Sequence, residues 1–141
     1  QARPLVYDAT SGRLLGAGTP TGRMSWLETV APSAAYAHPP VMERLVRLRD
    51  ATCRAPACRR RADSCDCDHV VAYPKGPTSV DNTCSLCRRH HRLKTHAPGW
   101  DLAMSDDGTA TWTSPSGRTI QTHPADYRPP LDRSVDDRPP F

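Results

Sequence analysis

The sequence predicts an α+β fold: a small zinc-stabilised domain with an N-terminal helix and a C-terminal antiparallel β-meander. Three observations lead to this class. Apolar residues recur with helical spacing over 40–51, two pairs of soft metal ligands lie between residues 53 and 90, and apolar and polar residues alternate over 100–122. Hydrophobic residues make up only 37% of the 141-residue chain. A chain with so little apolar surface often depends on a bound metal for its stability.

The chain divides into three parts by composition. Residues 1–38 form an N-terminal extension, in which PLVYD and RLLGAG flank the turn-forming ATSG and predict a β-hairpin. Residues 39–123 carry the metal ligands and the meander and form the main domain. Residues 124–141 contain prolines at 129, 130, 139 and 140 among charges of both signs, and this composition predicts a disordered tail.

Each element of the main domain has its own local signal. A Pro-Pro pair at 39–40 followed by VMERLVRLRDA predicts a helix that leads into the first cysteine pair, with Val41, Leu45 and Leu48 on one face. CDCDHVVAY predicts a strand and PKGPTSVDN a turn. CSLCRRHHRLKTH lacks Gly and Pro and predicts a helix that ends before the Pro-Gly pair at 98–99. WDLAMS, TATWTS and RTIQT around the turns DDG and PSG predict three antiparallel strands.

The charge of the chain indicates a polyanionic partner. The net charge is +4 and the isoelectric point is near 8.9, with basic residues concentrated at 59–61 and 88–94 beside the metal ligands. We expect phosphate contacts from the second group, which consists of Arg88, Arg89, Arg92 and Lys94. No apolar run is long enough to span a bilayer, and no signal peptide precedes the cysteines, so we expect a cytoplasmic protein without a membrane partner.

The cysteine spacing indicates zinc rather than disulfides. Cys53-x4-Cys58 followed by Cys87-x2-His90 is typical of a zinc knuckle, and the nearby histidines favour a metal. Cys84 is an alternative fourth ligand, because Cys84-x2-Cys87 would complete a site with four cysteines. The two remaining cysteines, at 65 and 67, are interpreted as buried thiols.

Between the ligand pairs lie residues suited to phosphodiester hydrolysis, which needs a base for the attacking water and a cation for the charge that develops on phosphate. A neutral imidazole suits the base, which makes His69 the candidate. Asp68 supplies a hard oxygen ligand for Mg²⁺ or Mn²⁺, and His91 on the following helix supplies a second ligand, which also allows another divalent ion. Taken alone, a residue such as Asn82 in front of a helix is usually a cap.

Taken together, His69, Asn82 and His91 resemble the His-Asn-His (HNH) endonuclease signature in its ββα-metal form. The resemblance covers residues 50–96 and is strongest in the DH pair, the DN pair and CRRHHRLKT. It is closest to actinobacterial repeat-family proteins in which an HNH domain follows a domain of unknown function. PPVMERLVRLRDATCRAPAC looks like the junction in those proteins, which implies that residues 1–38 are the end of the preceding domain.

The resemblance also implies roles for residues whose part is otherwise open. Asn82 inherits the role of bracing the loop and orienting the base, although it could instead be a metal ligand. The family register aligns Cys87 and His90 with a second pair that is normally Cys-x2-Cys. It therefore favours His90 over Cys84, and replacement of Cys by His still gives an acceptable site with three cysteines and one histidine.

The sequence therefore predicts a metal-dependent HNH endonuclease that hydrolyses DNA, with a structural Zn²⁺ and a catalytic divalent ion. The alternative is a non-catalytic zinc-containing module that binds nucleic acid. Binding alone does not require Asp68, His69 and His91, which favours the enzyme. A zinc domain that only mediates protein contacts would leave the basic helix unexplained.

Overall fold

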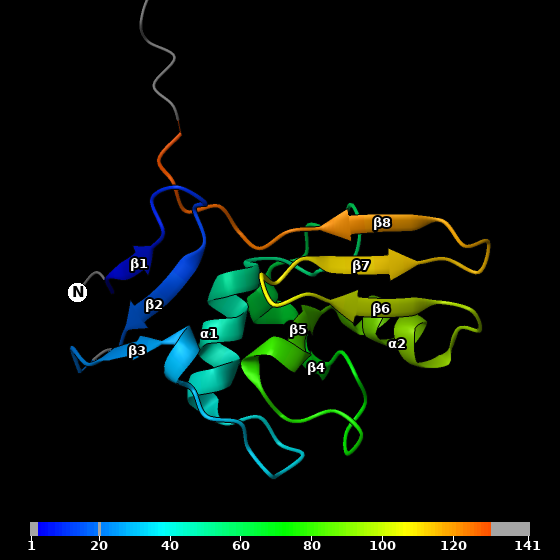
Figure 1. Ribbon diagram of the computed structural model, residues 1–141, viewed down its shortest axis with the longest axis horizontal. Helices are drawn as coiled ribbons and strands as arrows, with labels where there is room; N and C mark the ends of the chain where they lie inside the picture. Colours follow the sequence, from blue (N-terminus) through cyan, green and yellow to red (C-terminus); the bar gives the residue numbers. More distant parts are fainter. Residues whose placement is uncertain (1–2, 20, 131–141) are drawn as a thin grey trace, which may run out of the picture.

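The computed structural model describes residues 3–19 and 21–130, which form three small antiparallel sheets and two α-helices (Figure 1). The α+β class is therefore confirmed, as are the helix in front of the first cysteine pair and the C-terminal meander. Neither helix in the described part of the chain is long and apolar enough to cross a membrane.

The elements follow one another in a simple order. The first sheet consists of β1 (Leu5–Tyr7), β2 (Leu14–Gly18) and β3 (Met24–Trp26), followed by helix α1 (Pro40–Asp50). A two-stranded hairpin of β4 (Asp66–His69) and β5 (Thr83–Leu86) leads into helix α2 (Arg88–His96). The meander consists of β6 (Asp101–Met104), β7 (Ala110–Thr113) and β8 (Thr119–Thr122). Short 3₁₀ helices lie at Leu27–Thr29, Ala62–Ser64 and Val80–Asn82.

Helix α1 forms the centre of the molecule, between the first sheet and the hairpin (Figure 1). Its first residue is Pro40, whose missing N–H is of no cost in the first turn. Met42, Leu45 and Val46 are fully buried and form the inward face of the helix. The face expected from the sequence was Val41, Leu45 and Leu48, but Val41 is exposed and Leu48 is only partly buried, so the inward face is turned from the expected one. Arg44 donates a hydrogen bond to the carbonyl of Gly18, which ties the first sheet to this helix.

Two apolar clusters make up the core. The larger one joins the hairpin, the cysteine loop and the meander, and it includes the fully buried side chains of Leu86 and Trp112. The smaller one joins α1 to the hairpin through Met42, Val46 and Val80. The larger cluster contains Cys84 and Leu86 of β5, and Cys67 of β4 packs against the smaller one, so the hairpin that carries the candidate catalytic residues contacts both clusters.

A buried charge network holds these parts together. Asp50 at the end of α1 accepts hydrogen bonds from Arg49 at 2.9 Å and from Arg54 at 2.8 Å, and its second oxygen accepts from the backbone N–H of Ser85 at 2.8 Å. Arg54 continues to the meander, where it donates to the carbonyls of Gly108 and Thr122. Because all three side chains are almost fully buried, they must hydrogen-bond to one another or to the backbone.

Helix α2 begins later than the sequence predicts. Residues 84–86, which the sequence assigned to the helix, belong to strand β5, paired antiparallel with β4 so that Cys84 is opposite Asp68 and Leu86 is opposite Asp66. Cys84 and Leu86 are fully buried. A short apolar segment without Gly or Pro suits either a helix or a buried strand, and here pairing with β4 decides the outcome.

The segment that follows the meander also differs from the expected disordered tail. Ala125 donates from its backbone N–H to the carbonyl of Arg49 at 2.9 Å, and Tyr127 donates to the carbonyl of Gly12 at 2.9 Å. The hydroxyl of Tyr127 bonds the carbonyl of Leu48. The prediction is therefore wrong for residues 124–128, because these contacts fix the chain across α1 and the first sheet. Residues 131–141 of the expected tail lie outside the described residues.

Candidate metal and catalytic site

Cys53, Cys58, Cys87 and His90 form one compact group of potential metal ligands. Their four ligand atoms all lie within 4.8 Å of one another. Nδ1 of His90 is 3.5 Å from Sγ of Cys53 and 3.2 Å from Sγ of Cys87. In a tetrahedral zinc site with ordinary bond lengths, a sulfur and a nitrogen ligand are about 3.6 Å apart. The group could therefore hold a metal ion such as zinc.

Local backbone structure brings these ligands together. The first two cysteines lie on a tight loop, in which Cys58 donates its N–H to the carbonyl of Ala55 at 3.2 Å and Ala57 has a φ of 57°. Cys87 is the residue that precedes the first turn of α2, and its N–H points at Sγ of Cys53 at 3.3 Å. His90 lies one turn further along the helix, so its ring reaches the same point.

The start of α2 also favours a thiolate at Cys87. Burial acts in the opposite direction, but hydrogen bonds from the backbone N–H of His90 and from the side chains of Cys53 and Cys58 lower the pKa of the Cys87 thiol. Burial lowers the pKa of His90, with a further effect from Arg89, so its ring is neutral and able to act as a ligand near neutral pH.

Cys84 is not part of this group. Its side chain is fully buried on β5, within the larger apolar cluster, and burial raises the pKa of its thiol. Of the two candidates for the fourth ligand, the structure brings His90 to the other three and leaves Cys84 apart. Cys65 is also buried, and burial raises the pKa of its thiol to about 11, which suits the expected inert role.

A second polar group lies between β4 and α2. His91 contacts two carboxylates with its two ring nitrogens: Nδ1 is 2.9 Å from Oδ2 of Asp66, and Nε2 is 3.2 Å from Oδ1 of Asp68. Lys94, one turn further along α2, donates to Oδ2 of Asp68 at 2.8 Å and to the carbonyl of His69 at 2.6 Å. The expected ligand pair, Asp68 and His91, is therefore brought together.

Asp66 is a site residue that the sequence argument missed. Asp66 and Asp68 are two positions apart on β4, and alternate residues of a strand face the same side. Once Asp68 is taken as a ligand, this period-of-two rule places Asp66 beside it and toward α2. The sequence therefore held a usable signal for Asp66.

His69 faces the opposite side of β4. Its ring stacks on Tyr36 at a centroid distance of 5.4 Å and lies 4.4 Å from the ring of His38 and 5.8 Å from that of Tyr73. His69 is 4% exposed, and this burial lowers the pKa of the imidazole; Asp68 acts in the opposite direction and Lys94 in the same one. The ring is therefore neutral near neutral pH.

Two of the three rings that cover His69, those of Tyr36 and His38, come from residues 33–38, which we call the strap. The strap pairs with the loop that follows β4, through a bridge between Ser33 and Thr78. Tyr73 donates from its hydroxyl to the carbonyl of Ala34 at 2.9 Å. Local sequence patterns carry no signal for this contact, because it joins segments about 40 residues apart.

The side chain of Asn82 spans the loop between β4 and β5. Its Oδ1 accepts from the N–H of Val71 at 2.8 Å, and its Nδ2 donates to the carbonyls of Val71 and Pro77 at 2.9 and 2.8 Å. Gly76 lies so close to this amide that an added Cβ would overlap it. The amide of Asn82 is thus engaged by the loop backbone.

The four basic residues expected to contact phosphate do not share one environment. Arg88, Arg89 and Arg92 are exposed on α2, and Arg88 pairs loosely with Asp66 at 3.2 Å. Lys94 differs, because only 13% of its side chain is exposed and its ammonium bonds Asp68 and His69. The structure therefore places Lys94 within the polar group and leaves the three arginines on the surface.

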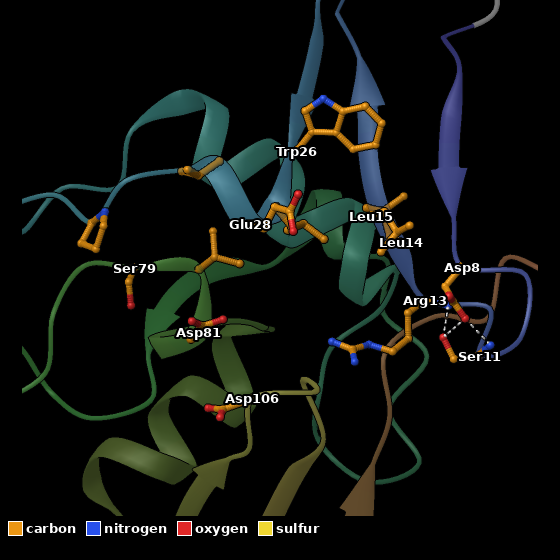
Figure 2. Close-up of a pocket in the computed structure, with 14 residues that line it drawn as sticks. Asp8, Ser11, Arg13, Leu14, Leu15, Trp26, Glu28, Ser79, Asp81 and Asp106 are labelled. Atoms are coloured by element: carbon orange, nitrogen blue, oxygen red, sulfur yellow. Dashed lines mark hydrogen bonds between the residues drawn. The ribbon is translucent and has the colours of Figure 1, made fainter.

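A pocket with a volume of about 790 Å³ lies away from these residues. It is bounded by the first sheet, by residues 79–81 in front of β5 and by the β6–β7 turn. Figure 2 shows Asp8, Glu28, Asp81 and Asp106 around it, with Trp26 and Leu15 on one wall. None of the predicted catalytic or metal-binding residues lines it.

Comparisons with known proteins give relatives but no family. No family model matches the chain, and no solved structure matches it. Over 83 residues, or 59% of its length, the chain is 48% identical to "Uncharacterized protein Rv3776" of Mycobacterium tuberculosis. Over the same share it is 47% identical to "Uncharacterized protein Rv2100" of that species. The match covers 16% and 15% of these two proteins. The chain is therefore similar to a short part of much longer mycobacterial proteins.

Proposed function

We propose that this domain is a metal-dependent endonuclease of the HNH type, which hydrolyses DNA phosphodiester bonds on a scaffold stabilised by structural zinc. The observation that carries the proposal is the pair of Asp68 Oδ1 and His91 Nε2, 3.2 Å apart on β4 and α2. Two ligands bound at right angles to an octahedral Mg²⁺ or similar ion are about 3.0 Å apart. The donor atoms thus have the chemistry and the spacing that a catalytic divalent ion needs.

The order of elements supports the same proposal. The hairpin β4–β5 is followed directly by α2, which is the order strand, strand, helix of the ββα-metal arrangement. The remaining atoms of the ligand pair are already engaged: Asp66 holds Nδ1 of His91, and Lys94 holds Oδ2 of Asp68. These contacts orient the two ligands and leave one atom of each for the ion.

Each side chain then has a defined task. A bound divalent ion would supply positive charge for the phosphate and the leaving oxygen. His69 would take a proton from the attacking water, whose oxygen forms the new bond to phosphorus. The bond to the leaving sugar oxygen breaks with its electron pair, and that oxygen takes a proton from solvent. Asn82 would hold the loop after β4, and with it the end of the strand that carries His69.

The zinc-binding group would act through stability. Three thiols and one imidazole match a closed structural zinc site. Its ligands come from the loop after α1 and from the start of α2, so zinc would connect α1 to the helix that carries His91. The Zn²⁺ ion would therefore help to hold the two halves of the candidate catalytic site in register.

One observation favours the alternative, a non-catalytic zinc module that binds nucleic acid. His69 is 4% exposed beneath the strap, whereas a general base must reach water at the phosphate. The exposed arginines of α2 serve either function equally well. The two proposals are separated by activity and not by affinity.

Cleavage of supercoiled plasmid with added Mn²⁺ or Mg²⁺, with and without chelator, tests the proposal. His69→Ala should keep the fold and DNA affinity and lower the cleavage rate about 10²-fold or more. His91→Ala should lose cleavage through weaker metal binding, so a higher metal concentration should restore part of it. His123→Ala, which changes an exposed histidine after the meander, is the matched control and should cut normally.

Two outcomes would overturn the proposal or part of it. If the wild-type domain binds DNA but does not cut it, whichever divalent ion is added, the non-catalytic module is the correct function. If His69→Ala cuts at the wild-type rate, the base is another group.

A further inference from the structure

The hydroxyl of Thr78 lies between the strap and the ring of His69. It donates a hydrogen bond to the carbonyl of Ala35 at 2.7 Å, and it lies 2.7 Å from Nε2 of His69. Thr78 is fully buried, so water does not compete for either contact. A hydroxyl has a single proton and a carbonyl can only accept. The proton of Thr78 is therefore used by Ala35.

This geometry determines which nitrogen of His69 carries hydrogen. Because the hydroxyl of Thr78 can only accept toward the ring, Nε2 must be the donor. In a neutral imidazole the other nitrogen, Nδ1, then has the free lone pair. A hydrogen bond at one ring nitrogen commonly sets the chemistry of the other in this way.

We propose that Thr78, fixed by the strap carbonyl of Ala35, holds His69 in its Nε2–H form and makes Nδ1 the atom that accepts the proton. The catalytic part of this inference rests on the proposed nuclease function. Thr78 acts through His69 and is therefore a positioning residue. The sequence assigned the strap to the N-terminal extension. On this inference the strap belongs to the candidate site, because its Ala35 carbonyl fixes the hydroxyl of Thr78.

His38 provides an internal control, because it is held by the same kind of contact. Its Nε2 lies 3.1 Å from the hydroxyl of Thr83, and that hydroxyl donates to the carbonyl of Ser79 at 2.7 Å. Thr83 is as fully buried as Thr78. Thr78→Val therefore removes the hydroxyl that contacts His69, and Thr83→Val removes the equivalent hydroxyl that contacts His38.

Histidine-selective ¹⁵N and ¹³C NMR of the full chain, loaded with zinc and without added Mg²⁺ or Mn²⁺, shows directly which nitrogen of each ring carries the proton. We expect wild-type His69 to be protonated at Nε2 and bare at Nδ1. Thr78→Val should shift His69 toward a mixture of both forms and leave His38 unchanged. Thr83→Val should do the reverse, and Thr78→Ser should restore the wild-type spectrum of His69. Wild-type His69 with its proton on Nδ1 would overturn the inference, and this spectrum decides it even if Thr78→Val fails to fold.

Cleavage kinetics test the catalytic part. A serine protease whose histidine is held in the wrong form loses about 10⁴-fold in kcat, and we expect Thr78→Val to lose at least about tenfold. KM for DNA and the affinity for Mn²⁺ should not change, whereas a purely structural role would change both. Thr78→Ser should recover the rate. An unchanged kcat in Thr78→Val would refute the catalytic part of the inference. A wild-type protein that does not cut DNA would refute both the catalytic part and the proposed function. In either case the NMR spectrum still decides whether His69 is in its Nε2–H form.

Discussion

Oδ2 of Asp66 lies 2.9 Å from Nδ1 of His91, on the side of the ring opposite to the nitrogen that approaches Asp68. An imidazole whose first nitrogen donates a hydrogen bond to a carboxylate can present its second nitrogen, without a proton, to a metal ion. Asp66 thereby orients His91, and its effect should be visible in metal binding itself.

Asp66→Ala should weaken Mn²⁺ binding by about 10- to 100-fold, the usual effect of losing such a supporting contact. Isothermal titration of the zinc-loaded protein measures this directly, without any need for activity. Asp101→Ala removes an exposed carboxylate from β6 and is the matched control. Equal affinity in the two variants would show that Asp66 does not support the ion.

The fourth zinc ligand can be tested by exchanging one residue at a time. His90→Ala should lose tightly bound zinc and much of the folded structure, because zinc-binding free energy is also folding free energy here. Cys84→Ala should keep about one zinc per chain and lose about 1 kcal/mol of stability, as an ordinary core substitution does. Metal analysis by mass spectrometry, together with circular dichroism, distinguishes the two. Loss of zinc in Cys84→Ala would contradict the geometry of the cysteine loop.

The charge network at the end of α1 predicts a large loss of stability for Asp50→Ala. That change leaves the buried guanidinium groups of Arg49 and Arg54 without their carboxylate and should cost about 3–5 kcal/mol. Asp63→Ala breaks an ion pair with Arg61 that is mostly exposed and should cost at most about 1 kcal/mol. Urea unfolding compares the two variants. A similar small loss in both would mean that the network contributes little.

The exposed arginines of α2 predict a salt effect on DNA binding. Replacement of Arg88, Arg89 or Arg92 by Ala should weaken binding to all sequences alike and reduce the salt slope by about 0.9 per lost phosphate contact. Fluorescence anisotropy at several salt concentrations measures the slope. Arg23→Ala makes the same change of charge on the first sheet and should leave the slope unaltered. If Arg23→Ala acts like the α2 variants, the effect is one of net charge only.

The parts of the fold that could be predicted from the sequence are those with short-range rules. Alternating residues predicted the meander because a strand exposes alternate side chains on opposite faces. Apolar residues three to four positions apart predicted α1, because residues with this spacing lie on one face of a helix. The spacing of the cysteines predicted three of the four ligands, because a metal restricts which spacings can converge on one point. It left Cys84 and His90 open as the fourth, and the resemblance favoured His90, which the structure brings to the other three.

The parts that failed depend on contacts between distant segments. Asp50 and Arg54 are charged residues of the kind usually found at the surface, and only the folded chain shows that they are buried partners. Cys84 lies in a segment that suits a helix as well as a strand, and pairing with β4 decides between them. The strap carries no motif, since its hydrogen bonds with Thr78 and Tyr73 are accepted by backbone carbonyls that any sequence would provide.

The bridge between Ser33 and Thr78 bears on where the functional unit begins. A fragment that starts at residue 39 would retain His69, Asn82, His91 and the cysteine loop. It would lack the carbonyl of Ala35 and the rings of Tyr36 and His38, and the imidazole of His69 would be exposed to water on that side. In such a fragment the environment of His69 would differ from that in the intact chain. The shortest fragment that preserves this environment therefore begins at or before Ser33.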